Sequence, residues 1–246
     1  MFEDYIPKKK IGCLCPLAVI DTYAYEFYKL APKDVMTVMV PLGLQEFSAK
    51  DVERVFSTVD EKIDLLTERG VDIIYQSGVP LPILIGPEAL RKLLDRMASR
   101  AEVPVTAQVF GVVAAARRLG AKKIAAANKW TEAMNRTLGQ FFAAEGVSLI
   151  GWNTRAMAPS EFLKWTNDAS TQLAYDLGRG AFEKYPDADA VYIGGGSWLT
   201  LPVITRLEEE YGKPVITNQT ASVWYLLEQL DYWKPVSGYG RLMQSE

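Results

Sequence analysis

The segment Ala188–Thr200 reads ADAVYIGGGSWLT and joins a short apolar run to a glycine turn. Residues 190–193 are apolar and bounded by turn residues, a pattern typical of a buried parallel strand. Three glycines and Ser197 follow directly, and the residues from Trp198 onward predict the start of a helix. Glycines allow close approach of the backbone, and the unpaired N–H groups at a helix start attract anions. The segment therefore predicts either a binding turn at the carboxyl end of a strand or a turn that needs glycine only for its geometry.

The first and second parts of the chain repeat each other in three segments, in the same order and at an offset of roughly 110–117 residues. Matched order and spacing favour two related halves over the chance likeness of any two α/β units. Each half alternates apolar runs with amphipathic stretches, which predicts parallel sheets covered by helices. The paired segments are KKKIGC (8–13) with AKKIAA (121–126), VDIIYQSG (71–78) with ADAVYIGG (188–195), and EVPVTAQ (102–108) with KPVITNQ (213–219).

This pattern predicts an α/β fold of two pseudo-symmetric Rossmann-like halves with parallel sheets and an active-site cleft between them. We expect residues 1–118 to form the first half and residues 119–229 the second. The tail, residues 230–246, has little helical periodicity and is expected to pack on the first half and complete it. Facing halves bring the turns after the third strands, around Gly78 and Gly195, to opposite sides of the cleft.

One long helix is predicted between residues 48 and 69. Ser48 stands three residues before Asp51, which is the spacing of a capping box. Apolar residues then recur at helical spacing up to Leu66, and Gly70 ends the helix.

Charge and hydropathy exclude several classes of partner. The sequence carries 27 Lys and Arg residues against 30 Asp and Glu residues, a net charge of −3, and has no long basic run, so we expect no nucleic acid partner. No apolar run is long enough to span a bilayer and no signal-peptide pattern is present, so we expect no membrane partner. Cys13 and Cys15 are too close in a strand for an ordinary disulfide, which fits a reducing cytoplasm.

The sequence contains no histidine. This excludes a Ser-His-Asp triad, a Cys-His dyad and histidine ligands to a metal. No cluster of carboxylates at metal-ligand spacing replaces them, and we therefore expect no catalytic metal.

Five short motifs occur in order along almost the whole chain, and none of them is specific by itself. They are Ile11-Gly-x-x-x-Pro16, Leu42-Gly-Leu44, Asn135-x-x-Leu138, Gly195-Gly196-x-x-Leu199-Thr200-Leu201 and Gly238-Tyr-Gly-Arg-Leu242. With these motifs the chain resembles the aspartate/glutamate racemase superfamily, and within it the branch of arylmalonate decarboxylase and maleate isomerase. The resemblance implies two Rossmann-like halves, a site between them, no cofactor, and proton chemistry next to the carboxylate of a small acid.

The resemblance also shows where this sequence departs from the family. It implies two cysteines that face each other across the substrate in racemases and maleate isomerases, and only the second of them in the decarboxylase. Here the first position falls on or beside Gly78 and the second on Gly195, and a glycine side chain has no proton to give. The hydroxyl donors differ as well, because Gly78-Val79 stands where the decarboxylase has a Thr-Ser pair and Trp130 stands at a tyrosine position.

The remaining substrate-binding candidates all fall at the ends of predicted strands. Their backbone N–H groups and hydroxyls suit a carboxylate or an oxyanion, and their apolar side chains suit the rest of a small acid. The donors are Ser77, Gly78, Val79, Gly195, Gly196 and Ser197; the wall is formed by Pro16, Leu44 and Phe47, and Trp130 adds an aromatic face and one N–H group.

Cys15 and Lys129 are the first candidates to move a proton. Tyr75 and Tyr192, near the ends of the third strands, are others, although packing is the commoner role of a tyrosine in a strand. Cys15 ends the first strand, where a thiolate is a natural proton carrier and a buried core residue is the alternative. Lys129 ends the matching strand of the second half, where a desolvated amine is a base or a carboxylate partner, and a surface lysine is the alternative. Asp21 and Glu46 lie in nearby loops and become general bases only if they are buried.

Three functions fit these residues. The first is a cofactor-independent lyase that decarboxylates a malonate-like acid through an enediolate, with a proton from Cys15 or water and poor stereocontrol. The second is an isomerase, a hydrolase or a C–C-cleaving enzyme of another small carboxylate that uses Lys129 or a carboxylate. The third is a member that binds a small acid without changing it. The expected partner is a small carboxylate, and both a monomer and a homo-oligomer fit.

Overall fold

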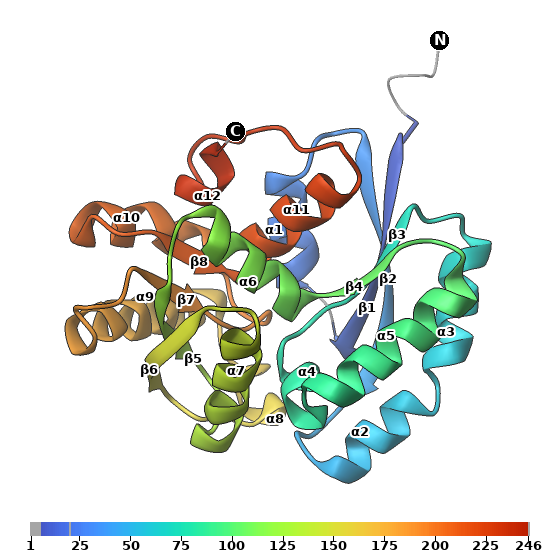
Figure 1. The fold of residues 1–246 in the computed structure, drawn as a ribbon, viewed down its shortest axis with the longest axis horizontal. Helices are drawn as coiled ribbons and strands as arrows, with labels where there is room; N and C mark the ends of the chain where they lie inside the picture. The colour runs from blue at the N-terminus through green and yellow to red at the C-terminus, as the bar shows by residue number, and fades with distance from the viewer. Residues whose placement is uncertain (1–5, 20, 246) are drawn as a thin grey trace.

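The computed structural model describes residues 6–19 and 21–245, which form two four-stranded parallel sheets (Figure 1). The first sheet has the order β2-β1-β3-β4 and the second β6-β5-β7-β8, so one topology occurs twice. This confirms the predicted α/β fold of two pseudo-symmetric halves. The strands are β1 (Lys9–Leu17), β2 (Val35–Leu44), β3 (Ile73–Gln76), β4 (Val105–Ala107), β5 (Lys123–Asn128), β6 (Ser148–Thr154), β7 (Ala190–Ile193) and β8 (Val215–Thr217).

Helices follow the strands in both halves and cover the sheets (Figure 1). Within residues 6–19 and 21–245, no helix combines the length and the apolar character needed to cross a membrane. The helices are α1 (Thr22–Leu30), α2 (Ala49–Phe56), α3 (Val59–Glu68), α4 (Pro80–Ile85), α5 (Pro87–Ala101), α6 (Gln108–Arg118), α7 (Glu132–Ala144), α8 (Pro159–Phe162), α9 (Asn167–Lys184), α10 (Leu201–Tyr211), α11 (Asn218–Gln229) and α12 (Arg241–Gln244).

The central strands are buried because helices cover both faces of a parallel sheet. All four residues of β7 are buried, as the apolar run at residues 190–193 predicts. In β5 every residue from Ile124 to Asn128 is buried, so its polar last residue ends inside the protein. These strands place the turn around Gly195 and the segment after Asn128 at the same edge of the second sheet.

The two halves join through α6 and α11, which pack against each other between the sheets (Figure 1). Buried amides at the starts of these helices cross the interface. Gln108 Nε2 donates to Ser222 Oγ at 2.7 Å, and Asn218 Nδ2 donates to Gln108 Oε1 at 2.9 Å. Because buried polar groups need their partners, this network fixes how the carboxyl ends of the two sheets face each other.

The long helix predicted between residues 48 and 69 is two helices, α2 and α3. The break falls at Ser57 and Thr58, whose hydroxyls donate to the carbonyls of Arg54 at 2.7 Å and Val55 at 2.9 Å. Such local bonds compete with the helical hydrogen bonds, so two adjacent hydroxyl residues end α2. Because the apolar periodicity continues across the break, the sequence pattern predicts one helix.

The C-terminal tail contacts elements of both halves. Helix α12 packs against α11 and β8, and the backbone N–H of Arg241 donates to both carboxylate oxygens of Glu208 in α10. The Tyr232 hydroxyl donates to Asp34, which precedes β2 in the first half. The tail therefore bridges the two sheets on the side away from the ends of β1 and β5.

Candidate active site

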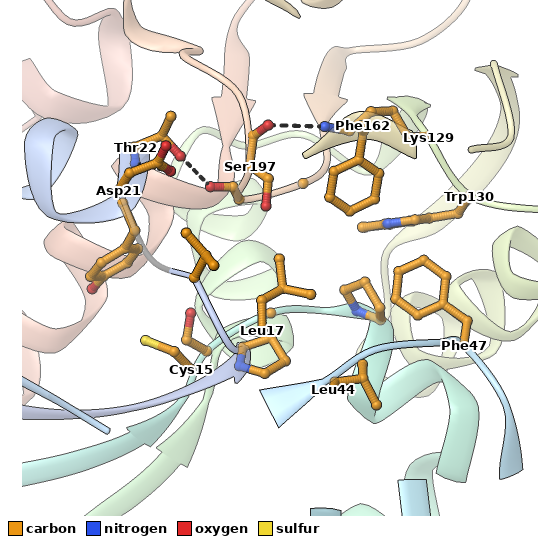
Figure 2. Close-up of a pocket in the computed structure, with 18 residues that line it drawn as sticks. Cys15, Leu17, Asp21, Thr22, Leu44, Phe47, Lys129, Trp130, Phe162 and Ser197 are labelled. Atoms are coloured by element: carbon orange, nitrogen blue, oxygen red, sulfur yellow. Dashed lines mark hydrogen bonds between the residues drawn. The ribbon is translucent and has the colours of Figure 1, made fainter. Parts of the chain in front are cut away.

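A pocket lies between the halves at the carboxyl ends of β1, β2, β3, β5 and β7 (Figure 2). Open α/β sheets bind ligands at this edge. Both candidate proton carriers, Cys15 and Lys129, line the pocket, as do all but one of the predicted substrate-binding residues. Those that line it are Pro16, Leu44, Phe47, Ser77, Gly78, Trp130, Gly195, Gly196 and Ser197.

Val79 is the predicted binding residue that the structure places elsewhere. It is fully buried in the core, because the chain turns directly from Gly78 into α4. The pocket also includes residues that were not predicted to bind substrate. These are Val19, Asp21, Thr22, Tyr23, Pro80 and Phe162, whereas Leu17, which also lines the pocket, extends the predicted apolar wall from Pro16.

Three successive carbonyls in the turn after β7, those of Gly195, Gly196 and Ser197, each accept one side-chain hydrogen bond. The bonds run from Trp198 Nε1 to Gly195 O (3.1 Å), from Thr22 Oγ1 to Gly196 O (2.8 Å) and from Lys129 Nζ to Ser197 O (3.3 Å). Thr22 belongs to α1 of the first half, so the turn is held from both sides of the pocket (Figure 2). The N–H groups of these three residues have no acceptor among the described residues and remain free for a ligand.

Glu26, which the sequence pattern did not indicate as a site residue, caps the N-terminus of α10. The helix begins at Leu201 rather than at Trp198, and Glu26 Oε1 accepts the N–H groups of Thr200 at 2.5 Å and Leu201 at 2.8 Å. Burial raises the pKa of Glu26 to about 7, although these bonds favour its carboxylate form. The anion that this helix start attracts is therefore an internal carboxylate. The candidate donors Gly195, Gly196 and Ser197 precede the two capped residues and are not involved.

The backbone N–H of Gly78 is also occupied. It donates to Gln108 Oε1 at 2.7 Å, which ties the turn after β3 to the interface between the halves. The prediction that this N–H holds a substrate carboxylate is therefore wrong. The hydrogen-bond donor that remains beside Gly78 is a side chain, the hydroxyl of Ser77 in the pocket wall.

Alanine at Gly78 should destabilise the protein far more than alanine at Gly196. Gly78 has a φ of +83°, and an added Cβ would overlap Cγ of Pro16. We expect a loss of roughly 2–4 kcal/mol in the free energy of unfolding from backbone strain plus overlap. Gly196 is the matched control because an added Cβ meets nothing within 4 Å. Urea unfolding of both variants checks this, and equal midpoints would contradict the geometry.

Cys15 lines the pocket but is poorly suited to proton transfer. Its Sγ lies 3.1 Å from Sγ of Cys13, and both side chains are buried. The hydrogen bond to Cys13 and burial raise the pKa of the Cys15 thiol well above its ordinary value. The thiolate that proton transfer needs is therefore suppressed.

Lys129 is buried, with 3% of its surface exposed, and directs its amine between two aromatic rings. Nζ lies 4.2 Å from the ring centre of Trp198 and 4.3 Å from that of Phe162. Burial lowers the pKa of Lys129 to about 7. The aromatic faces favour the ammonium form and offset part of this burial cost. Lys129 makes no ion pair with any described residue, so its amine is free to serve a ligand.

The wall opposite Lys129 is apolar. Pro16 and Leu17 from the end of β1 and Leu44 and Phe47 from the end of β2 line this side of the pocket (Figure 2). Asp21, an exposed residue before α1, also lines the pocket. A small acid bound here meets donors on the side of the glycine turn and hydrocarbon on the other side.

A family model described as arylmalonate decarboxylase matches residues 24–243. The chain belongs to the arylmalonate decarboxylase family. An arylmalonate decarboxylase from Bordetella bronchiseptica is 26% identical over 210 residues, which cover 85% of this chain and 86% of the relative. A liganded double mutant of arylmalonate decarboxylase superposes with a TM-score of 0.84 at 25% identity, covering 96% of this chain and 98% of that chain. The maleate isomerase Iso from Pseudomonas putida S16 has a TM-score of 0.83 at 18% identity over 96% and 98% of the two chains, which shows a shared fold.

In this member of the arylmalonate decarboxylase family, Lys129 lies beside the position that the sequence resemblance assigns to the second cysteine. A Cβ atom added to Gly195 would lie 3.7 Å from Cε of Lys129 and 3.0 Å from Nε1 of Trp198. The backbone φ of Gly195 is +129°, a conformation that other residues rarely adopt. A cysteine is therefore disfavoured here, whereas an amine already occupies the neighbouring space.

Proposed function

We propose that this protein is a cofactor-independent decarboxylase of a small malonate-like acid, in which Lys129 takes the place of the family's cysteine as proton donor. The observation that carries the proposal is the position of the Lys129 amine, next to Gly195 and inside the pocket. Its pKa near 7 leaves both protonation states populated at neutral pH, which suits a general acid.

The two sides of the pocket support carbon–carbon cleavage. The free N–H groups of the glycine turn and the Ser197 hydroxyl are donors for the carboxylate that the product keeps. The second carboxylate then faces the apolar wall around Leu44 and Phe47, where a charge is poorly solvated. Departure as uncharged carbon dioxide relieves this cost, and the donors stabilise the enediolate that remains.

After carbon dioxide leaves, the proton comes from Lys129, on one side of the pocket. The C–C bond electrons enter the retained carboxylate to form the enediolate, and the Lys129 ammonium gives its proton to the α-carbon. The neutral amine recovers a proton from water through the pocket opening at Gly196, which is exposed. No second protein acid is required, whereas isomerisation between two opposed groups needs one in each half. The suppressed Cys15 thiol is a poor candidate for that second group, which favours decarboxylation over the isomerase alternative.

Proton NMR in D₂O with a panel of small acids tests this function. We expect phenylmalonate and methyl-phenylmalonate to lose carbon dioxide, with deuterium at the α-carbon of the product. Cys15→Ser should keep this turnover, because the thiol is not the donor. Exchange or isomerisation of maleate, aspartate or glutamate without carbon dioxide loss would support the isomerase alternative. Saturable binding of a malonate with no turnover would instead support a protein that only binds small acids.

A further inference from the structure

Lys129 has the surroundings of a nucleophilic amine as well as those of an acid. Lysines become nucleophiles when an apolar pocket desolvates them and leaves the amine without a proton at neutral pH. Here the amine is buried between two aromatic rings, and burial alone accounts for its lowered pKa. Cys15, Asp21, Tyr23 and Glu46 are the other titratable groups lining the two cavities that Lys129 borders, and none of them pairs with it.

We propose that Lys129 forms an imine with the ketone carbon of a 3-oxo acid and that the protein decarboxylates such acids through this covalent adduct. This activity goes beyond the proton transfer proposed above. Here the iminium accepts the electron pair of the broken C–C bond, whereas in the malonate reaction the retained carboxylate accepts it. It extends the substrate class from malonates to 3-oxo carboxylic acids.

Each step balances with water as the only co-reactant. The neutral amine of Lys129 adds to the ketone carbon. The carbinolamine then takes a proton from water, leaving hydroxide, and loses its oxygen as water to give a protonated imine. The bond between the α-carbon and the carboxylate then breaks, carbon dioxide leaves, and the electron pair reduces the iminium to an enamine. A proton from water adds to the α-carbon, and water hydrolyses the resulting iminium to release a ketone and restore the amine.

The residues around Nζ suit the cation in this sequence. The iminium carries its positive charge at the position of the lysine nitrogen, where the faces of Trp198 and Phe162 lie 4.2 and 4.3 Å away. Aromatic faces at such distances stabilise cations, so they stabilise the adduct without a counter-ion. The Ser197 carbonyl, 3.3 Å from Nζ, accepts the N–H of the same iminium.

The glycine turn leaves space for the ketone. Gly195 has no side chain beside Cε of Lys129, and any Cβ there would lie 3.7 Å from it. On the other side, the exposed Gly196 gives water access to form and hydrolyse the adduct. The apolar wall receives the departing carboxylate in the same way for 3-oxo acids as for malonates.

Borohydride trapping with 3-oxobutanoate tests the proposal. We expect intact-mass spectrometry of the treated wild-type protein to show one adduct of about 42 Da, an isopropyl group on nitrogen, and peptide mapping to place it on Lys129. Lys129→Met and Lys129→Arg should lose the adduct and at least 100-fold of the 3-oxobutanoate turnover. The matched control is Lys164→Met, which removes an exposed lysine and should change neither.

The outcomes separate this inference from the proposed function. No adduct in folded wild-type protein, or adducts spread over surface lysines, would overturn the imine even if malonates are decarboxylated. A specific adduct on Lys129 without malonate turnover would overturn the proton-donor function and leave the imine intact. Lys129→Arg keeps a cation between the rings, so a folded Arg variant that still turns over 3-oxobutanoate also contradicts the imine.

Discussion

We expect the replacement of Lys129 by methionine to remove most of the turnover of malonate-like acids and at the same time to stabilise the fold. Loss of the proton donor should lower kcat by roughly 10²–10⁴-fold, which is the usual contribution of a positioned acid. The stability gain follows from burial, because the native state holds this amine with a pKa of about 7 against 10.5 for an unperturbed lysine. Each pKa unit corresponds to about 1.4 kcal/mol, so the buried amine costs roughly 4–5 kcal/mol at neutral pH. Methionine fills a similar volume without a charge and also packs well on aromatic rings.

The pH dependence of the free energy of unfolding provides a control for this prediction. Between about pH 7 and 10.5 the unfolded chain binds a proton at this lysine that the folded chain does not. Stability of the wild type should therefore gain from this group as pH rises through that window, and Lys129→Met should remove the gain. Thermal unfolding at pH 6, 8 and 10 measures the stability gain of the wild type and its loss in Lys129→Met. Lys164→Met, which removes an exposed lysine, is the control. A methionine variant that is inactive because it fails to fold, or one that keeps its turnover, would contradict the role assigned to Lys129.

The rate of malonate decarboxylation should fall about tenfold per pH unit above pH 7. The proposed proton donor is the ammonium form of Lys129, and its fraction declines once the pH exceeds its pKa of about 7. From pH 7.5 to 9.5 we therefore expect kcat to fall close to 100-fold. The imine route has the opposite slope, because its nucleophile is the neutral amine, and kcat/KM for 3-oxobutanoate should rise across neutral pH.

The titration of Glu26 must be distinguished from that of Lys129 in this pH profile. Its pKa is also raised to about 7, and it holds the N-terminus of α10 behind the glycine turn. Glu26→Gln keeps an oxygen acceptor and removes the titration, so the profile should persist in that variant. Lys129→Arg should remove the fall, since arginine does not lose its proton in this range. A profile that disappears in Glu26→Gln would assign the pH dependence to the turn and not to the lysine.

Much of the fold could be read from the sequence because its signals are local and repeated. The apolar run at residues 190–193 and its counterpart at 71–75 fix the third strand of each sheet, and the repeat fixes the shared strand order. The first strands, β1 and β5, pair with these third strands, and their carboxyl ends bring Cys15 and Lys129 to one pocket. Strand β6 was missed because its residues, SLIGWNT, mix polar and apolar side chains without a regular period.

The parts of the site that could not be predicted depend on contacts between the halves. Glu26 looks like an ordinary helical residue of α1, and only the assembled fold shows that it caps α10. Gln108 begins α6 directly after β4, and its side chain accepts the N–H of Gly78 while donating to Ser222 of the second half. Phe162 ends the short helix α8, and only the assembled fold shows its ring centre 4.3 Å from Nζ of Lys129. Such long-range pairings leave no periodic signal in a single sequence.

The stereochemistry of the product tests the role of Lys129 most directly. Decarboxylation of methyl-phenylmalonate creates a chiral α-carbon, and chiral chromatography of the product measures which face received the proton. A donor fixed on one side of the pocket, between Trp198 and Phe162, predicts one enantiomer in clear excess and only residual turnover by Lys129→Met. A racemic product, or the same enantiomeric excess from Lys129→Met at undiminished rate, would contradict Lys129 as the proton donor.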